Sequence, residues 1–267
     1  MKKTHIPGRW GKIFVRDSGG KGMPVLLLHG NSQGSETFLP QLEGEVGSAF
    51  RLLAFDRLGH GNSDRAKDPD NAYTLSGCVE QIREVINYFQ LQAPVWVGHS
   101  LGGHLALQAL ARGVACAKIF VFSAPPLKSL SSLTEAFLPH PALPSLFKGN
   151  LSNEEQVQCV EAIVSSKDTY TSLIRTLLQI SDPKVRTVLA GSLQEELHDE
   201  VQALHQASVP KAVGIGEKDL LVNRQYLERV LPPDVWRKKL ILFPNSSHTP
   251  QLENPDIFNQ ILLDFLA

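Results

Sequence analysis

Short, continuous apolar runs recur along the chain and predict buried β-strands. They lie at residues 13–15, 25–28, 52–55, 95–97, 119–122, 212–215 and 240–243. The runs are apolar throughout instead of alternating with polar residues. We therefore expect both faces of most of these strands to be covered, as in a mostly parallel sheet.

Helical patterns separate several of these runs. Residues 74–89 carry apolar side chains at three- and four-residue spacing, and residues 256–266 repeat this pattern directly after Pro255. Strands that alternate with amphipathic helices are typical of a doubly wound α/β fold.

The alternation breaks between residues 125 and 209, where no strand pattern occurs. Helix-start signals stand there instead, at Ser152 with Glu155, at Asp168, and at Asp182 with Pro183. Because the strand pattern resumes at residue 211, we expect a core of residues 1–124 and 210–267 with a helical lid, residues 125–209, inserted between two strands. An independent second domain is the alternative.

The pentapeptide Gly98-His99-Ser100-Leu101-Gly102 separates a predicted strand from a predicted helix. A G-x-S-x-G sequence in this context is typical of a nucleophile elbow, in which a serine sits on a turn too tight for larger neighbours. The turn exposes the Ser100 hydroxyl and directs N–H groups of the helix start toward the same space. The alternative is a glycine-rich connection with an idle serine.

A serine hydroxyl needs an adjacent base to act as a nucleophile at neutral pH. His248 lies in the turn after the last predicted strand, and Asp219 follows the strand at residues 212–215. Loops at the carboxyl ends of parallel strands carry the sites of such sheets. We therefore expect His248 to take the proton of Ser100 and Asp219 to orient the imidazole, with Glu217 as the nearest rival of Asp219.

The oxyanion of such a reaction requires two N–H donors. We expect one from Leu101, directly after the nucleophile, and the other from Asn31, in the loop after residues 25–28. The side chain of Asn31 is also expected near the substrate. Asp56, which ends another strand before a glycine-rich loop, is interpreted as structural.

Composition excludes several other classes of function. The 267 residues carry a formal net charge of −1 without a basic stripe, which argues against a nucleic-acid partner. No apolar run is long enough to span a membrane, and no signal-peptide pattern follows Met1. Three scattered cysteines favour the cytoplasm. Without metal-ligand spacing or a nucleotide fingerprint, no cofactor and no metal are expected.

Taken together, these residues resemble the α/β-hydrolase superfamily. A nearer resemblance, to its metal-independent N-acyl-homoserine lactone lactonases, is carried by His29-Gly30-Asn31-Ser32 and by residues 40–45 and 98–105. This resemblance implies an enzyme that opens a lactone ring without a metal. Some members of that group have tryptophan where this chain has His99. The serine at position 100 argues against dehalogenases and epoxide hydrolases of this fold, which use aspartate.

The sequence thus predicts a serine hydrolase that cleaves a carboxylic ester or lactone with an apolar acyl part, through an acyl-enzyme on Ser100. A carbon–carbon bond hydrolase, a thioesterase and a perhydrolase remain alternatives because they can use the same triad. A non-catalytic small-molecule receptor of this fold is an alternative from a different class.

Overall fold

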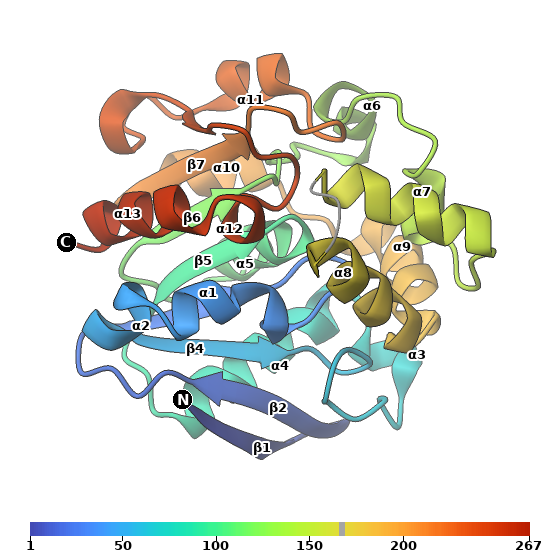
Figure 1. Cartoon of the computed structure of the whole chain (residues 1–267), viewed down its shortest axis with the longest axis horizontal. Coiled ribbons are helices and arrows are strands. Elements are labelled where there is room, and N and C mark those ends of the chain that lie inside the picture. Colours follow the sequence, from blue (N-terminus) through green and yellow to red (C-terminus); the bar gives the residue numbers. More distant parts are fainter. Residues whose placement is uncertain (166–168) are drawn as a thin grey trace.

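The computed structural model describes residues 1–165 and 169–267, and within them one sheet forms the centre of the molecule (Figure 1). Its strand order is β1-β2-β4-β3-β5-β6-β7-β8. The strands are β1 (Lys2–Gly8), β2 (Gly11–Asp17), β3 (Pro24–Leu28), β4 (Arg51–Asp56), β5 (Val95–His99), β6 (Ile119–Phe122), β7 (Lys211–Gly216) and β8 (Ile241–Phe243). Pairing is antiparallel from β1 to β4 and parallel from β4 to β8, which confirms the predicted mostly parallel α/β fold.

Each of the seven predicted strands is present, but β1 was not predicted. It pairs antiparallel with β2 at the edge of the sheet, and Ile6 is its one buried residue. An edge strand of this kind needs little apolar surface, so its sequence, which begins with two lysines and a threonine, carries no continuous apolar run.

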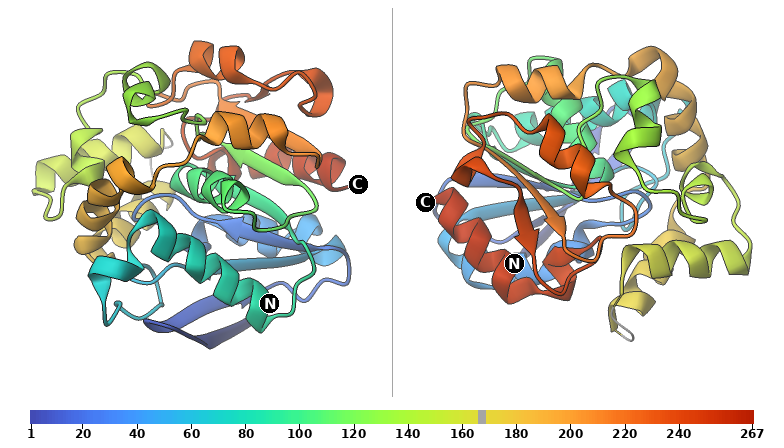
Figure 2. Two further views of the ribbon diagram at one scale, coloured as in Figure 1. Left: turned by 180° about the vertical axis from the view of Figure 1, so that it is seen from behind. Right: turned by 90° about the horizontal axis from the view of Figure 1, so that it is seen from above.

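Helices cover both faces of the sheet (Figures 1 and 2). One face carries α1 (Leu39–Leu42), α2 (Glu45–Ala49), α12 (Pro250–Glu253) and α13 (Pro255–Leu266). The other carries α4 (Leu75–Tyr88), α5 (Leu101–Ala111) and α10 (Glu200–Gln206). The remaining α-helices are α3 (Pro69–Ala72), α6 (Leu133–Ala136), α7 (Asn153–Ile163), α8 (Thr169–Ile180), α9 (Lys184–Glu196) and α11 (Arg224–Val230). Short 3-10 helices lie at Ser35–Phe38, Leu130–Ser132, Pro144–Phe147 and Trp236–Lys238.

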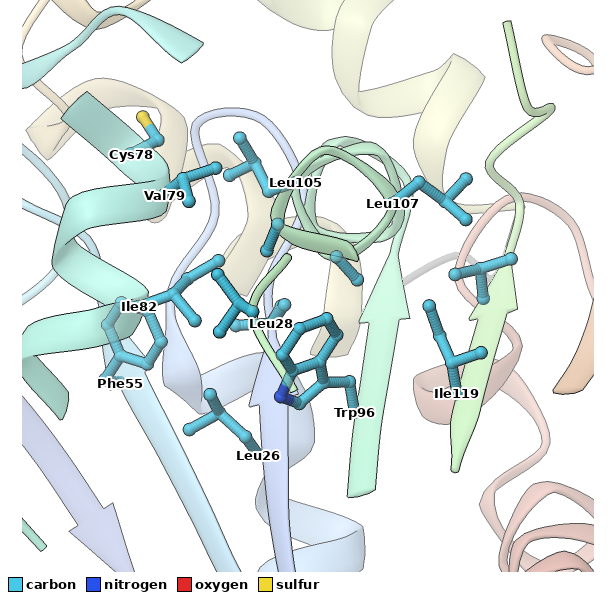
Figure 3. Close-up of a cluster of buried hydrophobic side chains, with 14 of the residues drawn as sticks. Leu26, Leu28, Phe55, Cys78, Val79, Ile82, Trp96, Leu105, Leu107 and Ile119 are labelled. Atoms are coloured by element: carbon cyan, nitrogen blue, oxygen red, sulfur yellow. The ribbon is translucent and has the colours of Figure 1, made fainter. Parts of the chain in front are cut away.

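The two helical layers enclose two separate hydrophobic cores. Leu26, Leu28 and Trp96 of the sheet pack with Val79 and Ile82 of α4 (Figure 3). The opposite core is built around the aromatic rings of Phe120, Phe122, Phe243 and Phe258. Because helices pack on both faces of the sheet, the parallel strands are held in place. The candidate site is built from residues at the carboxyl ends of these strands.

Between β6 and β7, the described part of the chain forms helices and loops. Ser152 and Glu155 form the predicted capping box of α7, and α9 starts at Lys184, whose N–H donates to the Asp182 carboxylate. The predicted cap at Asp168 lies outside the described residues. Residues 125–209 are referred to below as the inserted segment, and their role as a lid remains a prediction.

The inserted segment is tied to the rest of the chain at both ends. An isolated antiparallel bridge joins Phe137 to Val222, and the N–H of Leu138 donates to the carbonyl of Leu221. At the other end, α10 packs against α5. In the parts of the chain that the structure describes, no helix has the length and apolar character needed to cross a bilayer.

Candidate active site

Ser100 occupies a strained turn between β5 and α5. Its backbone has φ 51° and ψ −121°, a region that side-chain-bearing residues rarely adopt. A Cβ atom on Gly98 would lie 2.6 Å from the carbonyl oxygen of Gly102, and one on Gly102 would lie 2.1 Å from that of Leu28. The two glycines therefore let the start of α5 approach the strand ends, which is the geometry of a nucleophile elbow.

The structure brings Ser100, His248 and Asp219 together. The Oγ of Ser100 lies 2.9 Å from Nε2 of His248, and Nδ1 of His248 lies 2.9 Å from Oδ2 of Asp219. The side chains of His248 and Asp219 are 3% and 0% exposed, so water is largely excluded from the contact between them. Glu217, the rival acid, is exposed.

The surroundings of Asp219 favour its ionised form. Burial raises the pKa of this carboxyl, but His248 and the N–H groups of Leu221 and Val222 outweigh burial, so the pKa is lowered. The two N–H groups donate to Oδ1 over 2.9 and 3.1 Å. Because an ionised carboxylate only accepts hydrogen bonds, Nδ1 of His248 carries a proton and Nε2 is left to accept one from Ser100.

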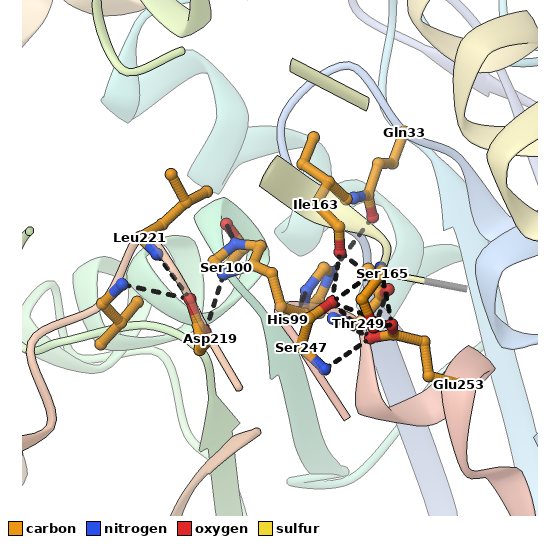
Figure 4. Close-up of polar contacts among 12 residues, drawn as sticks. Gln33, His99, Ser100, Ile163, Ser165, Asp219, Leu221, Ser247, Thr249 and Glu253 are labelled. Atoms are coloured by element: carbon orange, nitrogen blue, oxygen red, sulfur yellow. Dashed lines mark hydrogen bonds and ion pairs between the residues drawn. The ribbon is translucent and has the colours of Figure 1, made fainter. Parts of the chain in front are cut away.

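His99 contacts the backbone of His248 instead of the serine hydroxyl. Its Nε2 lies 2.7 Å from the carbonyl oxygen of His248, and its Nδ1 lies 3.1 Å from the side-chain amide of Gln33 (Figure 4). Burial, followed by the nearby His248, lowers the pKa of His99 to about 3, so the ring is neutral. The sequence gave no sign of this support for the His248 turn.

Glu253 was not predicted, although it anchors the same turn (Figure 4). Its carboxylate accepts from the N–H of Ser247 over 2.8 Å and from the Ser247 hydroxyl over 2.7 Å. It also accepts from the N–H and hydroxyl of Ser165, over 2.9 and 2.7 Å. Glu253 therefore connects the residue before His248 with the inserted segment.

Asn31 and Leu101, the predicted oxyanion donors, line the same cavity as Ser100. Leu101 is the first residue of α5, where a backbone N–H has no partner within the helix. The side chain of Asn31 donates from Nδ2 to the carbonyl of Leu146, over 2.6 Å. This amide therefore contacts the inserted segment as well as lining the cavity.

Buried groups brace the loop that carries Asn31. The Arg57 guanidinium donates to the carbonyls of His29 and Gly30, over 2.6 and 3.0 Å, and burial lowers the pKa of Arg57 to about 10. The Asp56 carboxylate accepts from the N–H of Asn62 over 2.8 Å and from the N–H of Ser35 over 2.5 Å. These contacts agree with the structural interpretation of Asp56.

The serine opens into an apolar cavity of about 490 Å³. Most of its wall comes from the inserted segment and from one face of α5. The apolar lining includes Leu127, Leu133, Phe137, Leu138, Leu143, Leu146, Phe147, Leu189, Leu193 and Leu197. A cavity of this size and character suits a small ligand with an alkyl chain.

The thiols are poor alternatives as nucleophiles. Burial raises the pKa of Cys78, Cys116 and Cys159 to about 11, so each thiol keeps its proton at neutral pH. Among the described residues, no group of three or more histidine, cysteine or acidic side chains is arranged to hold a metal ion.

Comparison with known proteins decides the family. A model of the alpha/beta hydrolase family matches residues 25–261. The chain belongs to this family. Among curated relatives, a proline iminopeptidase of Saccharolobus solfataricus is 24% identical over 92% of this chain and 86% of its own length. The bifunctional esterase/perhydrolase DCH of Acinetobacter calcoaceticus is 26% identical over 95% of both chains.

Solved structures confirm the nearer resemblance as well. A mutant of the N-acyl homoserine lactonase AidH, complexed with N-hexanoyl homoserine lactone, matches with a TM-score of 0.94 at 26% identity, over 100% of this chain and 97% of that chain. The putative aryl esterase of Burkholderia cenocepacia has a TM-score of 0.83 at 20% identity, over 99% and 98% of the two chains, which shows the shared fold.

Proposed function

We propose that this member of the family is a serine hydrolase that cleaves carboxylic esters or lactones with an apolar acyl part. One observation carries the proposal: the Ser100–His248–Asp219 contacts, each 2.9 Å long, end at a serine that lines an apolar cavity of about 490 Å³. A non-catalytic receptor would have no need for this strained and connected arrangement. Residues 125–209 would act as the lid over the cavity.

In the proposed first step, the Oγ of Ser100 attacks the substrate carbonyl while Nε2 of His248 removes its proton. Asp219, buried and held by two N–H groups, stabilises the imidazolium that forms. His248 then returns the proton to the departing alkoxide oxygen, and an acyl-enzyme remains on Ser100. In the second step, a water molecule gives its proton to His248 and attacks this ester. His248 then passes that proton to the Oγ of Ser100 as the carboxylic acid is released, which restores the free enzyme.

The negative charge on the tetrahedral intermediate needs donors that are already in place. We assign this role to the N–H groups of Leu101 and Asn31. The first has no partner within α5, and the second lies in the loop braced by Arg57. Fixed donors need no reorganisation when the charge develops, so they favour the intermediate over the substrate.

Among esters, we propose an N-acyl homoserine lactone as the substrate. Two observations support this choice: the likeness to AidH extends over the whole chain, and the cavity beside Ser100 is lined with leucine and phenylalanine. The lactone ring would lie at Ser100 and the N-acyl chain in the cavity. Because the three cysteines are unpaired, we place the reaction in the cytoplasm.

The test is hydrolysis of N-hexanoyl homoserine lactone beside p-nitrophenyl esters and a thioester of the same chain length. We expect rapid lactone opening, and a loss of about 10⁶-fold in turnover in Ser100→Ala. Ser48→Ala, on the exposed side of α2, is the matched control and should retain full activity. Ester cleavage without lactone opening would overturn the lactone assignment. Turnover that survives in Ser100→Ala would overturn the mechanism.

A further inference from the structure

The cavity contains a second polar group, one helical turn beyond the proposed nucleophile. His104 lies on α5, and its N–H donates to the carbonyl of Ser100 over 3.1 Å. Successive turns of a helix are about 5.4 Å apart along its axis, so a chain that leaves Ser100 along α5 passes this imidazole. His104 lines the cavity, and its side chain is 13% exposed.

The carboxylate of Glu200 fixes the orientation of this imidazole. Nδ1 of His104 lies 2.8 Å from Oε2 of Glu200, whose side chain is 0% exposed. The same carboxylate accepts from Nε2 of Gln108 over 2.9 Å and from the N–H of Leu127 over 2.9 Å. With donors on both of its oxygens, the carboxylate acts as an acceptor only, so the proton between the two side chains belongs to Nδ1 of His104.

The other ring nitrogen is left for a ligand. Among the described residues, no hydrogen bond involves Nε2 of His104, and the ring lies 6.2 Å from that of Phe137. Apart from Asn31 and Ser100 at the catalytic end, the polar residues that line the cavity in the described part of the chain are this His104–Glu200 pair and Thr134. The Thr134 hydroxyl already donates to the carbonyl of Ser131. Burying an imidazole nitrogen in an apolar cavity costs free energy when the nitrogen has no hydrogen-bond partner.

We propose that His104 selects substrates whose acyl chain carries an oxygen substituent, a hydroxyl or a keto group. Nε2 accepts from a hydroxyl when the ring is neutral and donates to a keto oxygen when the ring is protonated, while Glu200 keeps the ring in place. A plain alkyl chain leaves Nε2 without a partner. This inference rests on the proposed function, because that function places the reacting ester at Ser100 and so directs the acyl chain of the substrate toward His104.

Equilibrium binding tests the inference without depending on turnover. The ligands are N-hexanoyl homoserine lactone and its analogues with a hydroxyl or a keto group at successive carbons of the acyl chain. Their Kd values are measured by calorimetry on the Ser100→Ala protein. We expect at least one oxygenated ligand to bind about fivefold more tightly than the plain one, an effect of the size of one hydrogen bond.

The decisive variant is His104→Asn, made in the same Ser100→Ala protein. The asparagine amide can replace Nδ1 toward Glu200 but does not reach as far as Nε2, so the preference should fall below twofold. His104→Gln, which extends further into the cavity, should keep more of it. His205→Asn is the matched control, because His205 lies exposed on α10 outside the cavity, and it should keep the full preference.

Two results would overturn the inference: oxygenated and plain ligands binding equally to the parent protein, or a preference that survives in His104→Asn. Failure of the proposed function gives a different result, because wild-type protein would then show no Ser100-dependent turnover of any ligand in the series. A role of His104 limited to stability would lower the melting temperature of His104→Asn without changing the ratio of the Kd values.

Discussion

Nε2 of His99 donates to the backbone carbonyl of His248 over 2.7 Å, so the residue before the proposed nucleophile supports the residue proposed to activate it. Replacing His99 by phenylalanine removes this donor and keeps an aromatic ring. Because a misplaced catalytic group costs on the order of 10²-fold in rate, we expect kcat to fall by about that factor with little change in KM. Steady-state kinetics on the preferred ester checks this.

His99→Gln provides the comparison for that variant. Its side-chain amide can still donate to the carbonyl of His248, so it should retain more activity than His99→Phe. Equal kcat values in wild type and His99→Phe would show that the turn is held in place without this hydrogen bond.

His99 also makes stability depend on pH. Its pKa is about 3 in the folded protein, against an ordinary value of 6.5, so below pH 6.5 the unfolded chain binds a proton that the folded protein does not. Stability therefore falls as the pH drops from 6.5 toward 3, by about 2 kcal/mol between pH 7 and pH 5 from this one residue. His29 and His60, whose pKa values burial also lowers, act in the same direction.

Urea unfolding at pH 7 and pH 5 measures this effect. His99→Phe should lose less stability than wild type between the two pH values, because its unfolded state has one fewer group to protonate. Parallel losses in the two proteins would place the pKa of His99 in the folded state near its ordinary value.

The backbone of Ser100 predicts an unusual order of stability. At φ 51° and ψ −121° a glycine is unstrained, whereas alanine and serine pay for their Cβ atom. Ser100→Gly should therefore be more stable than Ser100→Ala by about 1 kcal/mol. Ser48, inside helix α2, provides the control with the opposite sign, because glycine there should be less stable than alanine. Thermal unfolding of the four variants gives both differences.

Glu253 should influence both stability and rate. Glutamine keeps the shape of this side chain but replaces one acceptor oxygen, so donors from Ser165 or Ser247 lose their partner. We expect Glu253→Gln to lose about 1–3 kcal/mol of stability and to have a lower kcat. Glu228→Gln, which breaks an exposed ion pair with Arg224, is the control and should change neither. If Glu253→Gln had the stability and kcat of the wild type, the remaining contacts would be sufficient to hold the turn.

The sequence predicted those features of the fold and the candidate site that depend on short sequence patterns. The parallel strands are apolar throughout, and Ser100, Asp219 and His248 each follow such a strand closely, so the topology alone brings them to one edge of the sheet. The Gly98 and Gly102 pair marked the turn because no other residue fits it.

The contacts that were missed join distant parts of the chain. Glu253 meets Ser165 across 88 residues, and Glu200 meets His104 across 96. Such pairs depend on how the inserted segment packs against the core, and no local sequence pattern determines that packing. Strand β1 was missed for a different reason, since an edge strand gains its stability from backbone pairing with β2 more than from apolar side chains.

The bridge between Phe137 and Val222 has a consequence for chimeric enzymes. Leu221 accepts from Leu138 through its carbonyl, and the N–H groups of Leu221 and Val222 donate to Asp219. A graft of residues 125–209 from a relative would exchange one side of this pairing and displace the loop that carries Asp219. An attempt to change the substrate range by replacing the inserted segment should therefore replace residues 217–223 as well.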